Sequence, residues 1–303
     1  MTDRRPLPVL LQWLTWPLAM AGGIAVVVLA PRFGLDPVAI SGAVSGVLIV
    51  LLAVMERIWP ADRQSAMTWR AFARDVQFFV VNGATIGATN TLFAWIGGAA
   101  TDTHRGLLSG WPLWIAVLLG VLVVDFVQYW QHRISHESPG PLGRVLWRAH
   151  AAHHLPEQVY VLMHPAGHPI NTFIVHGLVT ILPLYLLGFS AEAVILMNLV
   201  IGMVGIISHS NLDLRGGWLN YLFVGPELHR YHHSADLSEA GNYAAVLSLL
   251  DILFGSFVHM PGRLPVRIGI ADPEGYPRSG EVWKIMLLPF HAAIGRRRAS
   301  PEE

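Results

Sequence analysis

The sequence predicts an all-α fold: a polytopic membrane bundle of four to six helices, including a hairpin, with a cytoplasmic helical cap rich in histidine. Three observations support this prediction. Hydrophobic residues make up 53% of the 303 residues and charged residues only 13%, whereas soluble domains carry about 25% charged residues. Apolar runs of about 20 residues recur before residue 210, which is the length that crosses a bilayer. Most histidines follow the fourth run.

Six hydrophobic segments are the predicted membrane helices. They are residues 9–30, 38–55, 76–99, 111–130, 173–187 and 191–207. We interpret the first as a retained helix rather than a cleaved signal peptide, because it is long enough to span the membrane. The last two are shorter and only three residues separate them. They predict a tight hairpin that either crosses the membrane or dips into it.

Arginine placement predicts the orientation of the bundle. Arginines lie before the first segment and between the second and third, at positions 4, 5, 57, 63, 70 and 74, whereas the opposite loops hold Arg32 and Arg105. The positive-inside rule therefore places the N-terminus and the histidine-rich stretch in the cytoplasm. No organelle-retention signal is present, so we expect a bacterial inner membrane.

Three regions are expected along the chain. Residues 1–75 would form the first membrane helices and a cytoplasmic loop, 76–260 the catalytic domain, and 261–303 an interfacial segment with a basic tail. A formal net charge of zero argues against a nucleic-acid partner. The absence of cysteine excludes disulfides, thiolate metal sites and iron–sulfur clusters.

Histidine spacing gives the main indication of chemistry. Twelve of the 15 histidines lie between His132 and His233, and they form the motifs HRISH (132–136), HAAHH (150–154) and HRYHH (229–233). Positions i, i+3 and i+4 share one face of a helix, so each motif can direct its imidazoles toward one centre. Neutral imidazole is a ligand for zinc, iron, copper or nickel.

The number of candidate ligands favours two metal ions. A tetrahedral zinc site needs about four ligands. These motifs supply eight, and His209 makes nine. The candidate ligands are His132, His136, His150, His153, His154, His209, His229, His232 and His233. Polar residues near them are candidates to orient the imidazoles through the other ring nitrogen. These are Asp125, His168, Asn211, Glu227, Asp236, Asn242 and Asp251.

The remaining histidines have weaker expectations. His164 and His168 lie in the sequence HPAGHP, where proline prevents a regular helix. We interpret this stretch first as a turn near the site and second as a source of a ligand, His168. His176 lies within an apolar segment and is expected either to contact a metal-binding residue or to line the substrate path. The histidines at 104, 259 and 291 are expected to be structural.

At this point the sequence resembles the fatty acid hydroxylase/sterol desaturase family. The resemblance covers about residues 50–258 and rests on motifs that occur in the family's order. They lie at 125–136, 146–154, 208–211, 226–234, 242–243 and 249–255. Leu250 stands where the family commonly has tryptophan, and Ile252 where arginine is common. The stretch 163–169 lacks the acidic residue that usually follows its His-Pro.

The resemblance implies an iron-dependent lipid oxidase. Two iron ions would be held by the nine histidines, O2 would be the co-substrate, and a lipid from the bilayer would be hydroxylated or desaturated. The substrate class would be a fatty acyl chain, a sterol or a hopanoid-like lipid. Two electrons would come from a separate donor, either a ferredoxin or a b-type cytochrome with its reductase.

Two other functions remain open on the sequence alone. A zinc-dependent membrane lipid hydrolase would need fewer ligands and a carboxylate base, and its turnover would not need O2. A non-enzymatic metal sensor or transporter is the other alternative. A transporter should place polar ligands within the membrane span, whereas the motifs here lie beyond the helix ends.

Overall fold

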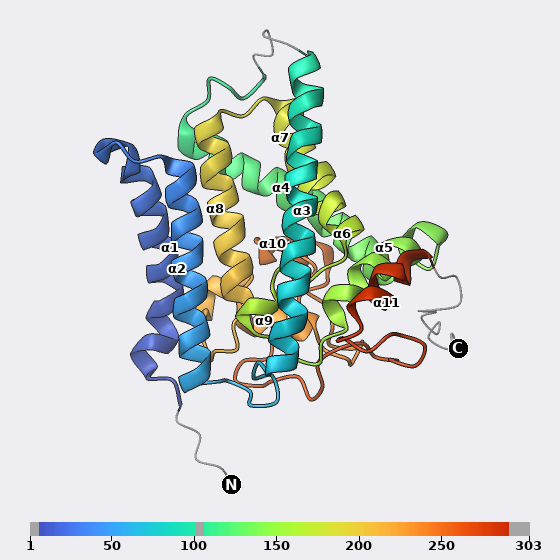
Figure 1. Cartoon of the computed structure of the whole chain (residues 1–303). Helices are drawn as coiled ribbons and strands as arrows, with labels where there is room; N and C mark the ends of the chain where they lie inside the picture. The colour runs from blue at the N-terminus through green and yellow to red at the C-terminus, as the bar shows by residue number, and fades with distance from the viewer. Residues whose placement is uncertain (1–5, 101–105, 291–303) are drawn as a thin grey trace.

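The computed structural model describes residues 6–100 and 106–290, and Figure 1 shows their arrangement. Helices and loops make up these ranges, with no β-strand among the described residues, so the predicted all-α class is confirmed. The α-helices are α1 (Val9–Leu29), α2 (Pro37–Ile58), α3 (Trp69–Ala100), α4 (Leu113–Glu137), α5 (Pro141–His154), α6 (Pro169–Phe173), α7 (Leu182–Leu187), α8 (Ala191–Ser208), α9 (Pro226–His232), α10 (Ser248–Phe254) and α11 (Val282–Leu287). The shorter turns are η1 (Ala30–Phe33), η2 (Val161–Met163), the π-helical η3 (Ile174–Ile181), η4 (Gly217–Tyr221) and η5 (Leu288–Phe290).

Five stretches of helix in the described ranges are long and apolar enough to cross a membrane, which agrees with the predicted four to six. They are Val9–Phe33, Pro37–Ile58, Leu113–Glu137, Pro169–Leu187 and Ala191–Ser208. The segment predicted at 76–99 belongs to α3, which has 32 residues but is not among the five. Polar residues recur along α3, and Asn82 and Thr89 are buried against the rest of the bundle.

Local chemistry sets the ends of several helices. The Asp36 carboxylate accepts hydrogen bonds from Val38 N–H and Ala39 N–H, and Pro37 occupies the first turn, so α2 begins with a filled cap. The Ser190 hydroxyl accepts from Ala193 N–H and caps α8. Gly188 ends α7 at φ 66°, a left-handed conformation that glycine adopts without steric cost.

Helix α8 lies at the centre of the bundle. It packs against α4, α2 and α1, and its side chains Met197 and Ile207 are fully buried. A Cβ atom at Gly120 of α4 would lie 1.6 Å from the Met197 sulfur, so glycine allows the two helices to approach closely. Small residues at such contacts stabilise helix pairs in lipid, where apolar burial alone drives little association.

The predicted hairpin is only partly correct. The turn between α7 and α8 is tight, and both arms belong to candidate spans. The arms nevertheless have different neighbours, since α6, η3 and α7 pack along α3 and α4 whereas α8 packs against α1, α2 and α4. The physical reason is that α4 offers a surface to both arms, so each arm buries its apolar side chains against the bundle.

The cap lies at one end of the bundle, in the middle and lower right of Figure 1. It consists of α5, α9, α10, α11 and the loops between them, and α9 packs against the end of α8. Helix α4 runs without interruption from the bundle into this cap, so the membrane helices and the cap form one framework.

Candidate metal centre

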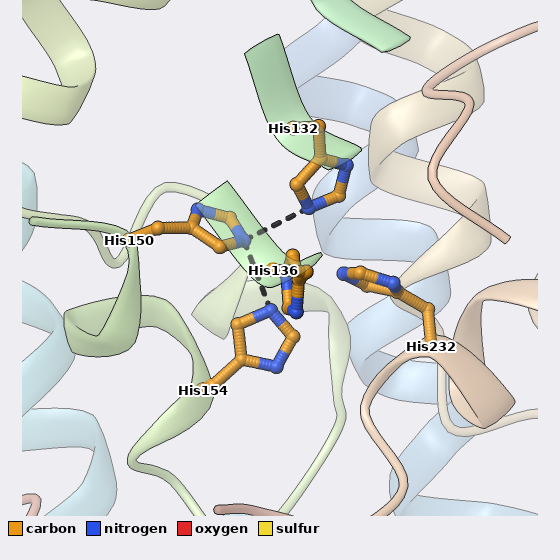
Figure 2. A group of neighbouring side chains, drawn as sticks. All are labelled: His132, His136, His150, His154 and His232. Atoms are coloured by element: carbon orange, nitrogen blue, oxygen red, sulfur yellow. Dashed lines mark hydrogen bonds between the residues drawn. The ribbon is translucent and has the colours of Figure 1, made fainter. Parts of the chain in front are cut away.

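All nine candidate histidines meet at the junction of bundle and cap, where they form two groups. The five-histidine group, shown in Figure 2, contains His132, His136, His150, His154 and His232. The four-histidine group contains His153, His209, His229 and His233. Within each group one ring nitrogen of every member lies within 4.8 Å of the others.

Two short helices serve both groups. Helix α5 directs His150 and His154 into the five-histidine group and His153 into the four-histidine group. Helix α9 does the reverse, because His229 belongs to the four-histidine group and His232 to the other. The groups are therefore neighbours, and the rings of His154 and His233 stack with centroids 4.4 Å apart.

Burial keeps these imidazoles neutral. His154, His232 and His233 are each at most 2% exposed, and burial holds the pKa of all three well below the ordinary value of 6.5. Burial likewise lowers the pKa of His153 to about 4. A neutral imidazole keeps a lone pair on one ring nitrogen, which is the form that binds a metal ion.

Main-chain carbonyl groups orient four of the rings. The Nδ1 atoms of His132 and His153 lie 2.8 Å from the carbonyl oxygens of Tyr243 and Ala166. The other two contacts are His209 Nδ1 to Gly205 O at 2.7 Å and His232 Nδ1 to Gly241 O at 3.0 Å. Since a carbonyl oxygen only accepts, each neutral ring carries its proton on Nδ1 and directs the Nε2 lone pair into its group.

Two of these lone pairs face each other. His153 Nε2 and His209 Nε2 are 3.1 Å apart, and both rings donate through Nδ1, so neither has a proton left to share. The Nε2 atom of His232 is buried and has no hydrogen-bond partner within residues 6–100 and 106–290. Lone pairs arranged in this way need a cation between them, and a metal ion fits that requirement.

The spacing of Nε2 atoms is compatible with shared binding of a metal ion. Neighbouring Nε2 atoms are 2.9 Å apart for His132 and His150 and 3.1 Å apart for His229 and His233. Metal–nitrogen bonds of about 2.1 Å place adjacent ligands about 3.0 Å apart at right angles and about 3.4 Å apart in a tetrahedron. The observed separations are therefore in the range expected for two nitrogen atoms that would bind one metal ion.

The carboxylates of Asp125 and Asp251 bond the main chain of a loop that in turn contacts His132. The buried Asp125 carboxylate accepts from the backbone N–H groups of 245, 246 and 247, and Asp251 accepts from those of Tyr243 and Ala244. Both acids therefore fix the loop whose Tyr243 carbonyl orients His132. Burial raises the pKa of Asp251 to about 6. These two carboxylates therefore bond main-chain N–H groups, and their effect on His132 is transmitted through the loop rather than through a direct contact with a ring nitrogen.

Three other predicted residues also hold loops. Asn242, at φ 60°, donates to the carbonyls of Leu228 and Val258 and so positions Gly241, which orients His232. Glu227 accepts from Gly216 N–H and the Asn220 amide. The Asn211 amide bonds the main chain of Asp62.

Two predicted residues are engaged elsewhere. His168 accepts from Ile170 N–H through Nδ1, which caps α6, and its Nε2 lies 3.1 Å from the Met286 carbonyl oxygen. Asp236 is exposed and accepts from Ser238. The structure therefore does not support His168 as a ligand or Asp236 as an orienting group; the prolines around His168 turn its ring toward the C-terminal segment.

Other polar side chains near the site carried little or no signal in the sequence. Nδ1 of His164 is 3.2 Å from Nδ1 of His209, in the turn that the prolines predicted. Asn171 of α6 bonds His150 from the membrane side. His176 bonds Asn90 on α3 at 2.8 Å, within the bundle. His259 contacts Asn220, and the histidines at 104 and 291 lie outside the described residues.

Comparison with known proteins agrees with this geometry. The chain is 32% identical over 237 residues to the ornithine lipid hydroxylase OlsE of Rhizobium tropici, covering 73% of this chain and 68% of that protein. The family described as fatty acid hydroxylase matches residues 117–256, which include all nine histidines. The chain belongs to the fatty acid hydroxylase family. It is therefore a membrane enzyme, a lipid-modifying oxidoreductase, as the sequence predicted.

More distant relatives include plant enzymes. The very-long-chain aldehyde decarbonylase GL1-7 of Oryza sativa subsp. japonica is 24% identical over 242 residues, 66% of this chain and 36% of its own length. The methylsterol monooxygenase 2-2 of Arabidopsis thaliana is 26% identical over 162 residues, 50% of this chain and 58% of its own length. No solved structure matches this fatty acid hydroxylase family member significantly.

Proposed function

We propose that this enzyme holds two iron ions and uses O2 to hydroxylate a C–H bond of a membrane lipid. The observation that carries the proposal is the pair of facing lone pairs on His153 and His209, which lie in one of two adjacent groups of buried, neutral imidazoles. The iron ions would supply the oxidising chemistry. The chain would hold them, keep water out and position the lipid.

Each group of histidines would hold one iron ion. The nine neutral rings provide nitrogen ligands without negative charge, and the described residues place no carboxylate oxygen within either group. The carbonyls of Tyr243, Ala166, Gly241 and Gly205 would keep the lone pairs directed inward before any ion binds.

The substrate is proposed to be an acylated amino lipid of the kind that the bacterial relative's name describes, ornithine lipid. That relative has the highest identity among those named above, and its similarity covers 73% of this chain. The arginine pattern supports a cytoplasmic metal centre in a bacterial inner membrane, where a ferredoxin or a b-type cytochrome with its reductase would donate electrons.

A groove beside α2 suits a lipid chain. It has a volume of about 290 Å³ and is lined mostly by apolar residues, including those of α2, Met67 and Leu162. The polar residues of its lining are Glu56, Arg57, Tyr160 and Asn211. Leu162 is two residues from His164, which contacts His209. We propose that an acyl chain reaches the metal centre along this side of the bundle.

A zinc-dependent lipid hydrolase is the second candidate function. Its support is that imidazole binds zinc well. Two observations weigh against it: the nine histidines exceed what one tetrahedral zinc site needs, and no carboxylate of the described residues lies within either group to act as a base. Family membership also favours oxidation.

The decisive experiment combines metal analysis with isotope labelling. Purified enzyme is expected to hold two iron ions per chain, and cells that express it under ¹⁸O2 are expected to accumulate a lipid carrying one added ¹⁸O atom. A protein with zinc and no iron, whose lipid product forms without O2, would refute the proposal. Loss of two hydrogen atoms without added oxygen would instead identify a desaturase.

A further inference from the structure

A second cavity lies beside one of the two groups. It has a volume of about 210 Å³, and His136, His154 and His232 line it. Its opposite wall is formed by 269–272 and Tyr276, which follow the family-matched region 117–256. Its lining includes no member of the four-histidine group. The C-terminal segment is thus part of the site, not only an interfacial tail.

Two aromatic side chains join this cavity to the five-histidine group. The Trp147 indole N–H donates to the Tyr276 hydroxyl at 2.7 Å. The Trp147 ring centroid lies 5.0 Å from that of His136 and 5.7 Å from that of His154. Trp147 is 7% exposed whereas Tyr276 is half-buried, so the pair runs from the group outward to the cavity wall.

The two groups differ in their aromatic neighbours. In the described part of the chain, the rings of His153, His209, His229 and His233 make ring contacts only with other histidines. The five-histidine group also contacts Trp147 and Tyr243. Tyr243 packs inward against Tyr129, so only Trp147 leads toward the cavity.

We infer that electrons enter the centre through Tyr276 and Trp147 and reach the ion in the five-histidine group first. This inference rests on the proposed function. In each transfer a one-electron donor protein of the ferredoxin or cytochrome class is oxidised by one electron and a ferric ion is reduced to the ferrous state. No bond forms or breaks, and no proton needs to move. The Trp147–Tyr276 hydrogen bond and the ring contact between Trp147 and His136 provide the path for this electron.

A purely structural role for the pair makes a different prediction. Buried tryptophan usually finds a hydrogen-bond partner for its indole N–H, and Tyr276 provides one. If that were its whole purpose, Tyr276→Phe would lower thermal stability but leave the rate of iron reduction unchanged. The two roles are therefore separable by measuring reduction rate, iron content and stability on the same variants.

The test measures anaerobic reduction of the iron-loaded, full-length enzyme in stopped flow, without lipid, using reduced methyl viologen as the one-electron donor. Trp147→Phe is expected to slow reduction about tenfold or more, equivalent to about 1.4 kcal/mol in the barrier. Tyr276→Phe should slow it in the same direction, and Trp147→Tyr should recover part of the rate. Trp218→Phe is the matched control, since Trp218 lies exposed on η4.

Wild-type reduction rates in iron-loaded Trp147→Phe and Tyr276→Phe would overturn the inference and leave the proposed function standing. If Trp147→Phe fails to hold iron, Tyr276→Phe and Trp147→Tyr decide, and wild-type rates in both overturn it. A wild-type enzyme that binds no iron would overturn the proposed function and this inference together.

Discussion

Replacing Asp125 by asparagine tests how the loop at 243–247 controls the metal centre. The carboxylate accepts three backbone N–H groups, two on one oxygen and one on the other. Asparagine keeps a single acceptor oxygen, and its amide N–H2 would face the Leu247 N–H. A hydrogen bond to a charged acceptor contributes about 1.5–3 kcal/mol, and an unsatisfied buried N–H costs about 1–3 kcal/mol.

The expected loss of stability is therefore about 2.5–6 kcal/mol, out of about 5–15 kcal/mol for a typical protein. Displacing this loop also moves the Tyr243 carbonyl from His132, which lies 2.8 Å away. Removal of such an outer partner lowers metal affinity by about 10–100-fold. Asp125→Asn should therefore both melt earlier and lose iron to a weaker chelator.

Thermal melting in detergent and iron content after dialysis against graded chelators measure the two effects. Asp236→Asn is the matched control, because Asp236 is exposed and its carboxylate accepts hydrogen bonds only from Ser238 among the described residues. It should change neither quantity. An Asp125→Asn enzyme with wild-type melting and wild-type iron retention would refute the reasoning that this carboxylate fixes the ring through the main chain.

Three further outcomes are expected. Alanine at His153 or His232 should lower iron content and lipid turnover together, and should reduce the affinity for iron by more than the roughly 100-fold expected for loss of an outer partner. His259→Ala should lower neither quantity. Normal iron content in both His153→Ala and His232→Ala would contradict their assignment as ligands. Val50→Trp, which fills the groove beside α2, should reduce kcat/KM for lipid about tenfold, or about 1.4 kcal/mol, and leave the iron content unchanged. Val47→Trp on the same helix is the control and should have no effect. Equal kcat/KM values in the two variants would exclude the groove as the lipid path. In the metal-free protein, burial lowers the pKa of His153 to about 4, whereas a histidine in the unfolded chain has a pKa near 6.5. The free energy of unfolding should therefore fall as pH drops from 6.5 to 4, by about 1.4 kcal/mol per pH unit for each such ring. A melting temperature that does not change over this pH range would contradict the expected loss of stability.

Hydrophobic length and histidine spacing were sufficient to predict the bundle and the nine converging rings. Both depend on residue type along one helix, as in α4, which carries apolar residues through the membrane and then His132 and His136 one turn apart. The number of histidines also predicted two ions, although neither number nor spacing indicated that α5 and α9 divide their histidines between groups. That division depends on how two helices pack, which no local pattern records.

The contacts that orient the rings could not be predicted in the same way. Side chains such as Asp125 and Asp251 were expected to orient the imidazole rings, but they bond the main chain of the loop at 243–247 instead. The atoms that contact His132, His153, His209 and His232 belong to the main chain, which every residue possesses. Likewise, nothing in residues 261–290 indicated that Tyr276 would return to the site, since that proximity comes from tertiary packing.

The carbonyl contacts bear on how such an enzyme can diverge. A side-chain partner can be lost in one substitution, but a carbonyl at Ala166 or Tyr243 survives any change that preserves the backbone path. Constraint moves instead to positions that shape the path, such as Gly241, where a Cβ would lie 2.2 Å from the Ser256 carbonyl oxygen. Substrate-facing side chains are thereby free to drift during evolution while the oxidising core stays the same.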